Sequence, residues 1–467
     1  MEDTPFWAEA YHGHTWIHPA ALVLLGIAVV LLFIVPRMYT LWPVIFIGCF
    51  VAPAQRIVVF GMDWTLLRLT LLAGLLRALV LIVQLRRAPR WHRIDTWLVL
   101  WLSSGVLIYC VREPSMDSLN NRLGWAFEYA AAYFLVRTAV VTWKDVRSLF
   151  CCFAFMSLPV AIAFINEQLT RYNVFGLMGG VELITREREG RLRCQGAFAH
   201  PILAGTYWAV VLPLIAALFW QHSVRFKFMA AIGIASTLTI VAACASSGPV
   251  ASVLAAVIAG LLLTVRAHFR YIRMGTVAVL TLLHLVMEAP VWHLVARIDI
   301  VGGSTGWHRF NLIDQWIRNT DNWFLVGTTS TATWAAIPVF DITNQYVLEA
   351  IRGGALTLFL FLGFLWCTFS TLGRTARRLE RTDHRLQAGL CWALGVSMFV
   401  HAVSWLAVSY FGQILVLTVM VPALAANVAQ QAECTDSSSR TRAAGPVRST
   451  RHTLATSQQQ HGASSSQ

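Results

Sequence analysis

Arginine collects in a polar stretch at residues 166–200, where Arg191 and Arg193 stand shortly before a histidine, His200. A guanidinium presents a flat fork of donors that holds phosphate oxygens in pairs. The stretch is therefore a candidate anion-binding surface. His200 precedes a proline at the entrance to an apolar run, so it is equally a candidate helix cap and a candidate catalytic group.

A second polar stretch, residues 289–346, combines arginine with aromatic rings. It holds His308, Arg309 and Trp316, and the apolar residues between Arg309 and Trp316 follow the spacing of an amphipathic helix on a membrane surface. Tryptophan and tyrosine rings stack on sugars, so this surface suits a phosphosugar carried by a lipid. So long a loop is uncommon unless it is functional or disordered, and this one is too aromatic for disorder. The simpler alternative is a set of solvated charges with interfacial aromatic anchors.

Apolar runs separate these stretches and must position them. Of the 467 residues, 57% are apolar and 13% are charged, and the mean hydropathy is +0.61, which excludes an ordinary soluble protein. A membrane crossing needs roughly 20 apolar residues. Runs of this kind lie at 18–35, 40–53, 64–83, 94–110, 125–141, 148–165, 201–220, 228–245, 249–265, 274–288, 347–369, 386–408 and 411–428. Because the runs at 40–53 and 274–288 are short, we predict an all-α polytopic membrane protein with about 12–13 transmembrane helices and two long outer loops.

The charges give these helices a direction. The formal net charge is +13, from 36 basic and 23 acidic residues, and the basic residues gather in every second connection. This is the pattern of cytoplasmic loops, so the charge reports topology and no nucleic-acid partner is expected. The predicted parts are an outer segment (1–17), ten helices over 18–288 that include the outer loop 166–200, the outer loop 289–346 with its amphipathic helix, three helices over 347–428, and a cytoplasmic tail (429–467) whose polar composition predicts disorder.

Cysteine usage gives no sign of a metal site. The nine cysteines are scattered, most of them inside predicted spans, and no two have the spacing of a zinc site. We therefore expect neither a disulfide framework nor a bound metal.

Charged residues inside predicted spans are functional candidates by default. Arg68, Arg77, Glu128 and Arg137 qualify, although Arg137 and Glu128 lie near the ends of their spans. Arg68 can reach the outer face near Asp63 and is a candidate substrate-binding residue. A transporter would place more polar groups at the middle of the membrane, so this distribution favours an enzyme with outer loops.

Four short motifs resemble those of the O-antigen ligase and O-antigen polymerase family. Residues 193–201 (RCQGAFAHP) are similar to the family's R-x-x-G-x-F-x-H-P entrance, and residues 246–249 (SSGP) to its tight outer turn. Residues 306–309 (GWHR) with 324–327 (FLVG) resemble its R…W…P-L-x-G-x-G block. Asn344, Tyr346 and Gly353-Gly354 fall where its H-N-x-Y-x-L…G-x-x-G segment enters the next span. The resemblance covers residues 166–369.

This resemblance implies a glycosyltransferase of the bacterial inner membrane that needs no metal or other cofactor and whose active site faces the periplasm. Its donor would be a glycan on undecaprenyl diphosphate. The acceptor would be another lipid-linked glycan in a polymerase, or lipid A core in a ligase. Membrane lipids, a flippase and a chain-length regulator would be its other partners.

The resemblance also implies residue roles. Arg193 and Arg309 would bind the donor's diphosphate and stabilise its growing negative charge as the glycosidic bond breaks. The substrate-binding residues would be Arg191, His308, Trp316, Asn344, Tyr346 and Arg68.

One departure from the family pattern bears on the acceptor. The family's ligases carry a histidine immediately before the asparagine that matches Asn344, and this chain has Thr343, which cannot act as a base near neutral pH. Asp341, Glu349 and His200 are then the candidate proton acceptors. The departure favours polymerisation of repeat units of O-antigen, capsule or exopolysaccharide. The alternatives are an O-antigen ligase and, in another class, a transporter of lipid-linked oligosaccharide or polysaccharide.

Overall fold

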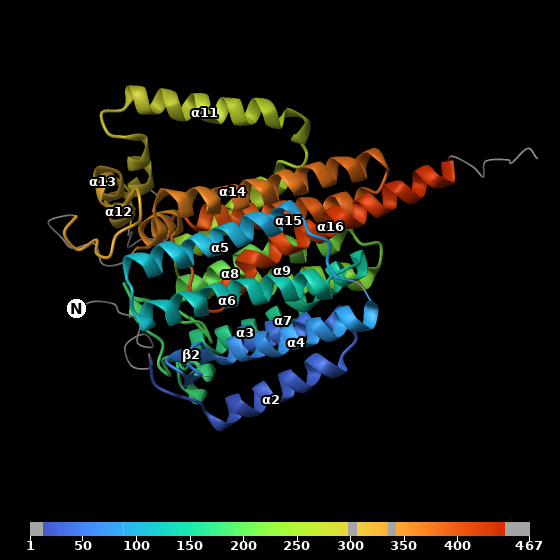
Figure 1. Cartoon of the computed structure of the whole chain (residues 1–467), viewed down its shortest axis with the longest axis horizontal. Coiled ribbons are helices and arrows are strands. Elements are labelled where there is room, and N and C mark those ends of the chain that lie inside the picture. The colour runs from blue at the N-terminus through green and yellow to red at the C-terminus, as the bar shows by residue number, and fades with distance from the viewer. Residues whose placement is uncertain (1–12, 87, 298–305, 335–341, 444–467) are drawn as a thin grey trace, which may run out of the picture.

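The computed structural model describes residues 13–86, 88–297, 306–334 and 342–443. Within these ranges the chain is almost entirely helical, with two small antiparallel hairpins. Most helices run side by side in one bundle, and α11 lies along its flank (Figure 1). The helices are α2 (Pro19–Ile34), α3 (Leu41–Phe50), α4 (Leu66–Leu85), α5 (Arg93–Arg112), α6 (Met116–Ala139), α7 (Trp143–Thr170), α8 (Pro201–Ala216), α9 (Val224–Ala243), α10 (Ser247–Leu261), α11 (Phe269–Val286), α12 (Gly306–Arg318), α13 (Thr320–Trp323), α14 (Gln345–Arg381), α15 (Arg385–Ser404) and α16 (Ile414–Ala443).

The hairpins lie in the connections between helices. β1 (Arg56–Val59) pairs with β2 (Met62–Thr65) between α3 and α4. β3 (Glu187–Arg188) pairs with β4 (Arg191–Leu192) in the connection between α7 and α8. Short 3-10 helices complete the described elements: Arg37–Tyr39, Val174–Met178, Ala217–Trp220, Arg266–His268 and Val291–Arg297.

Eight of the described helices are long and apolar enough to cross a membrane, as a multi-pass membrane protein requires. They are α4, α5, α7, α8 with its 3-10 extension, α9, α14, α15 and α16. Four further apolar helices are shorter: Pro19–Ile34, Arg37–Phe50, Ser247–Leu261 and Tyr271–Val286. Each apolar run predicted from the sequence coincides with one of these helices or with α6, so the prediction of helices at these positions is confirmed.

The helix ends gather at two opposite ends of the bundle. In Figure 1, β2, α12 and α13 lie at the left, and we call this the loop end. The C-terminal part of α16 lies at the right. At that opposite end Arg37 pairs with Asp145 at 3.0 Å and Arg266 pairs with Glu380 at 3.2 Å. We call it the basic end because the arginine-rich connections of the chain meet there.

Helix α6 begins earlier than its apolar run. The Ser115 side chain accepts a hydrogen bond from the backbone N–H of Ser118 at 3.1 Å, which caps the helix before Met116. The predicted span starts only at residue 125, because the first two turns of the helix are polar. The early start places Arg122 on a helix, whereas the sequence alone assigns it to an outer connection.

Helix α14 is broken about two turns after its start. Gly353 has φ −144° and ψ 20°, and Gly354 has φ 67° and ψ −170°, a left-handed conformation that favours glycine. The freed carbonyl of Ile351 accepts hydrogen bonds from the Thr328 backbone N–H (2.8 Å) and from Arg112 Nη1 (2.9 Å). Below the break, the Ala355 N–H donates to the Phe324 carbonyl at 2.7 Å. The loop at residues 324–328 therefore fills the break.

Two regions differ from the sequence-based expectation. The amphipathic helix in loop 289–346 is present as α12, and its Leu312 is buried in one apolar cluster with Trp323, Trp334, Val347, Ala350 and Ile351, whereas the sequence predicts an apolar face on a membrane surface. The tail is not disordered from residue 429, since α16 continues to Ala443. Alanine, glutamine and glutamate in that part of the tail favour a helix, and Glu433 lies 3.9 Å from Arg378. Residues 444–467 lie outside the described part of the chain.

Candidate functional site

Charged side chains from three helices meet beside the break in α14. They are Arg112 of α5, Arg122 of α6, and Glu349 and Arg352 of α14, and we call them the arginine cluster. The Cζ atoms of Arg122 and Arg112 lie 4.1 Å and 4.8 Å from the centroid of the Tyr109 ring, a geometry that stabilises a guanidinium by cation–π attraction. The cluster lies at the loop end, because the Arg112 side chain also donates to the carbonyls of residues 326 and 351.

Glu349 is the buried carboxylate of this cluster, with 2% of its surface exposed. Its Oε2 accepts a hydrogen bond from Trp101 Nε1 at 2.9 Å, and its Oε1 accepts one from Gln345 Nε2 at 2.8 Å. Burial of a carboxylate is costly unless it is hydrogen-bonded and close to positive charge. Arg352 and Arg122 supply that charge, since both interact with it electrostatically. Glu349 therefore has a fixed position.

The cluster holds more positive than negative charge. Arg122 and Arg352 lie close enough to repel each other, and Glu349 is the carboxylate that they share. Arg112 is paired separately with Glu113 at 3.2 Å. Among the described residues, Nε of the 5%-exposed Arg122 has no hydrogen-bond partner. An anion bound between Arg122 and Arg352 would relieve their repulsion and offer a hydrogen-bond acceptor to Arg122 Nε.

Helix α12 shares an apolar cluster with the first turns of α14. Arg309 is buried one turn before Leu312, the residue of α12 that belongs to this apolar cluster. Trp316 stacks on Trp323 with ring centroids 4.8 Å apart, and Trp323 Nε1 donates to the Trp316 carbonyl at 2.8 Å. His308 is half-buried on α12. Of the predicted residues, Arg309 and Trp316 thus lie on α12 and Glu349 lies on α14, and one apolar cluster includes residues of both helices.

Arg191 and Arg193 are held by a different set of elements. Arg191 is exposed in β4. The backbone N–H of Arg193 donates to the Arg186 carbonyl at 3.0 Å, and the next residue donates to the Ala243 carbonyl at the end of α9. Glu167 of α7 accepts hydrogen bonds from the backbone N–H groups of residues 195 and 196, both at 3.1 Å. The RCQGAFAHP motif is therefore fastened to α7 and α9, whereas Arg309 lies on α12.

Two predicted residues cap helices. His200 Nδ1 accepts a hydrogen bond from the Ile202 N–H at 3.1 Å, so the structure gives this residue the role of helix cap at the start of α8. Asn344 Oδ1 accepts hydrogen bonds from the N–H groups of Tyr346 (2.9 Å) and Val347 (3.2 Å) at the start of α14. These caps fix where each helix begins, and Asn344 thereby sets the position of Glu349.

Two other predicted residues remain, Tyr346 and Asp341. The hydroxyl of Tyr346 donates to the Ala402 carbonyl at 2.9 Å, which ties α14 to α15. Asp341 lies outside the described residues.

Arg68 stands at the end of an apolar groove between α5 and α6. Its Nη1 donates to the Asp63 carbonyl at 2.7 Å, so the expected proximity of Arg68 to Asp63 is confirmed, and its Nε donates to Glu128 at 3.2 Å. The groove has a volume of about 640 Å³. Its lining is mostly apolar and comprises Met62, Asp63, Trp64, Arg68, Val99, Leu102, Ser103, Val106, Leu107, Leu123, Gly124, Ala126, Phe127 and Ala130.

The groove adjoins the arginine cluster through α6. Leu123 and Gly124 line the groove, and the preceding residue, Arg122, belongs to the cluster. One face of α6 thus meets an apolar space and a neighbouring face meets fixed positive charge. This combination suits a ligand with a long apolar chain attached to an anionic group.

Sequence reasoning missed Arg112, Arg122 and Arg352 as members of the site. One local signal for Arg352 exists: it follows Glu349 by three residues, the spacing that brings helical side chains together. For Arg122 the corresponding signal is Trp125, three residues later, whose ring lies 5.8 Å from the Arg122 Cζ.

Within the described ranges, no group of three or more His, Cys, Asp or Glu residues is arranged to hold a metal ion. No family model matches the chain, and no curated protein is significantly similar to it in sequence.

Proposed function

We propose that this chain transfers glycan from an undecaprenyl-diphosphate-linked donor at the periplasmic face of the bacterial inner membrane. The specific reaction that we propose is chain extension, in which repeat units of O-antigen, capsule or exopolysaccharide are polymerised. The observation that carries it is the pair of guanidinium groups, Arg122 and Arg352, which share one buried carboxylate beside the break in α14. The motif resemblance supports the same assignment, as does Arg309 on α12, the helix that shares an apolar cluster with the first turns of α14.

The chemistry assigned to the cluster follows from its charges. The acceptor hydroxyl oxygen attacks the anomeric carbon of the donor sugar, and the bond from that carbon to the diphosphate oxygen breaks. Undecaprenyl diphosphate leaves with the electron pair, and Arg122 and Arg352 stabilise the charge that develops on it. Glu349 takes the proton of the acceptor hydroxyl. Two guanidinium groups supply the positive charge that a metal ion supplies in other transferases.

The apolar groove supports a lipid-linked donor. The isoprenoid chain of the donor would lie against the apolar face of α5 and α6, with the diphosphate next to Arg122. Arg68 would stand where the chain meets the outer face. Because the groove adjoins the arginine cluster, the donor could place its apolar chain in the groove and its diphosphate at the cluster at the same time.

The orientation of the chain in the membrane follows from its charge pattern. The basic end carries the arginine-rich connections, which suits the cytoplasm, and the loop end then faces the periplasm. The arginine cluster, α12 and the groove all belong to the loop end. Donor and acceptor glycans would meet there.

A deletion strain tests the function, and its glycan profile separates the alternatives. If the protein is a polymerase, the deletion strain should lose long polymer while it still makes and exports single repeat units. Long polymer that accumulates on undecaprenyl diphosphate and never reaches lipid A core would show a ligase. Repeat units retained in the cytoplasm would show a transporter. Either of these two profiles contradicts chain extension.

Complementation of that strain tests the site. Glu349→Gln and Arg352→Ala should each fail to restore long polymer at normal protein levels. Arg318→Ala is the matched control, because this arginine is exposed on α12 and pairs with Asp314. Full polymer in Arg352→Ala or Glu349→Gln would remove the cluster from the reaction.

A further inference from the structure

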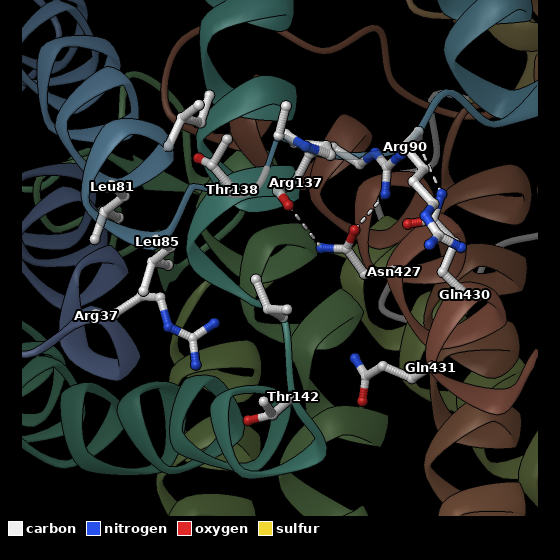
Figure 2. Close-up of a pocket in the computed structure, with 14 residues that line it drawn as sticks. Arg37, Leu81, Leu85, Arg90, Arg137, Thr138, Thr142, Asn427, Gln430 and Gln431 are labelled. Atoms are coloured by element: carbon white, nitrogen blue, oxygen red, sulfur yellow. Dashed lines mark hydrogen bonds between the residues drawn. The ribbon is translucent and has the colours of Figure 1, made fainter. Parts of the chain in front are cut away.

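A second cavity lies at the basic end, far along the bundle from the arginine cluster. It has a volume of about 320 Å³. Figure 2 shows Leu81, Leu85 and Arg37 on one side and Arg90 and Gln430 on the other, with Asn427 between them. The full lining is Arg37, Leu81, Ile82, Leu85, Ala88, Pro89, Arg90, Arg137, Thr138, Val141, Thr142, Asn427, Gln430 and Gln431.

The floor of this cavity is a closed polar network. Arg137 is 3% exposed and donates from Nε to Asp95 Oδ1 and from Nη2 to Asp95 Oδ2, both at 3.1 Å. Another nitrogen of Arg137 donates to the side-chain oxygen of Asn427. Asn427 Nδ2 in turn donates to the Val140 carbonyl at 2.7 Å. The floor is therefore rigid, and its charges are paired.

The rim differs from the floor, because it keeps open donors. Among the described residues, Nη2 is the one nitrogen of Arg37 with a partner, Asp145, at 3.3 Å from Oδ1 and 3.0 Å from Oδ2. Arg90 is exposed, and its contacts run through its backbone carbonyl, which accepts from Gln430 Nε2 at 2.7 Å. None of the residues lining the cavity is acidic. The rim thus offers guanidinium donors to an anion.

One wall of the cavity is apolar and continues onto the outside of the bundle. Leu81, Ile82 and Leu85 of α4 form this wall. Leu85 is 50% exposed and the nearby Val83 is 75% exposed, so the apolar face of α4 runs outward from the cavity. A ligand could place an anionic group between Arg37 and Arg90 and lay a hydrocarbon chain along α4.

We propose that this cavity binds the phosphodiester headgroup of an anionic phospholipid. Arg37 and Arg90 hold the phosphate, Gln430 and Gln431 stand beside the headgroup, and an acyl chain lies on Leu81, Leu85 and the exposed side of α4. Basic pockets between membrane helices at the cytoplasmic side favour such headgroups. The site is separate from the arginine cluster and does not depend on the proposed glycosyl transfer.

Binding to the full-length purified chain tests the proposal. The protein is titrated with phosphatidylglycerol in mixed micelles, with phosphatidylcholine in the same micelles, and with inorganic phosphate, and thermal stabilisation is recorded. Phosphatidylglycerol should stabilise the protein, and phosphatidylcholine or inorganic phosphate at equal concentration should not. Stabilisation by inorganic phosphate alone would show a soluble-anion site and overturn the assignment to lipid.

The variant Arg90→Ala tests whether lipid binding depends on this cavity or only on the overall positive charge of the basic end. It should weaken the affinity for phosphatidylglycerol about fivefold, which is the value of one basic side chain near an anionic lipid surface. Arg86→Ala is the matched control, because Arg86 is exposed in the same connection but does not line the cavity. Its affinity should equal that of the unaltered protein.

Arg37→Gln gives a second, independent variant at the opposite rim and should also weaken binding. Melting temperatures without lipid show that each variant is folded. Equal affinities in Arg90→Ala, Arg37→Gln and the unaltered protein, or equal losses in Arg90→Ala and Arg86→Ala, would overturn the proposal.

Discussion

Gly327 lies directly against the carbonyl of Ile351: a Cβ atom on residue 327 would stand 2.0 Å from that oxygen and 2.6 Å from Nη1 of Arg112. Gly354 makes the reciprocal contact, since its Cβ would stand 2.4 Å from the Leu325 carbonyl oxygen. The loop before α14 and the break within α14 therefore meet backbone to backbone. Residues 324–327 and the glycine pair 353–354 are separated in the sequence, yet their backbones contact each other in the structure, and we call this contact the joint.

Gly327→Ala should open this joint. The residue has φ +77°, a region that costs a non-glycine residue on the order of 1–3 kcal/mol, and the added methyl group collides with the Ile351 carbonyl. We expect a lower melting temperature and loss of polymer in the complementation assay. Gly373→Ala is the matched control, because a Cβ there meets nothing within 4 Å, and it should leave both readouts unchanged. Wild-type polymer in Gly327→Ala would show that the joint does not position the site.

Arg122→Ala should lower the transfer rate by about 10²–10³, the usual effect of removing one preorganised donor from a developing negative charge. Arg122→Lys should restore little of it, because an ammonium cannot supply the flat fork of a guanidinium. Initial rates with a purified lipid-linked glycan and protein levels in the membrane are the measurements. Equal rates of the proposed transfer in Arg122→Lys and the unaltered protein would mean that the position needs only a positive charge.

The orientation of the chain can be measured with two fusions. Alkaline phosphatase fused after Asn322, on α13 at the loop end, should be active, because the charge pattern predicts that this end faces the periplasm. The same fusion after Gln431, on α16 at the basic end, should be silent. The opposite pair of activities would move the arginine cluster to the cytoplasmic side and end the proposed reaction.

Cys194 should resist thiol reagents in the folded protein. Burial raises the pKa of its thiol to about 12, and nearby Glu167 acts in the same direction. The reactive thiolate then makes up only about one molecule in ten thousand at pH 8. Maleimide labelling of purified protein followed by peptide mass spectrometry should find Cys434, which is exposed, labelled first. Labelling of Cys194 should rise sharply only in denaturant, and fast labelling in the native state would contradict the packing of residues 193–196 on α7 and α9.

Much of the fold could be predicted from hydropathy, because a helix that crosses a membrane must be apolar along its length. The start of α6 could not, since Asp117, Asn120 and Arg122 are polar and only the Ser115 cap reveals the helix. Glu349 and Asn344 were accessible through motif and spacing. Arg112 was not, because its bond to the Ile351 carbonyl joins residues 239 positions apart, and no local pattern encodes such a contact.

The break at Gly353-Gly354 divides α14 into a short N-terminal piece and a long C-terminal piece, and the two pieces have different roles. Glu349 and Arg352 lie on the short piece. Its position is fixed by the Asn344 cap and by the hydrogen bonds of Arg112 and Thr328 to the Ile351 carbonyl. The long piece, from Ala355 to Arg381, packs in the bundle and carries no member of the cluster. Random mutagenesis should therefore yield two phenotypic classes with a border at Gly353-Gly354. Changes before the border should silence a protein that still accumulates, and changes after it should lower the amount of a protein that still works.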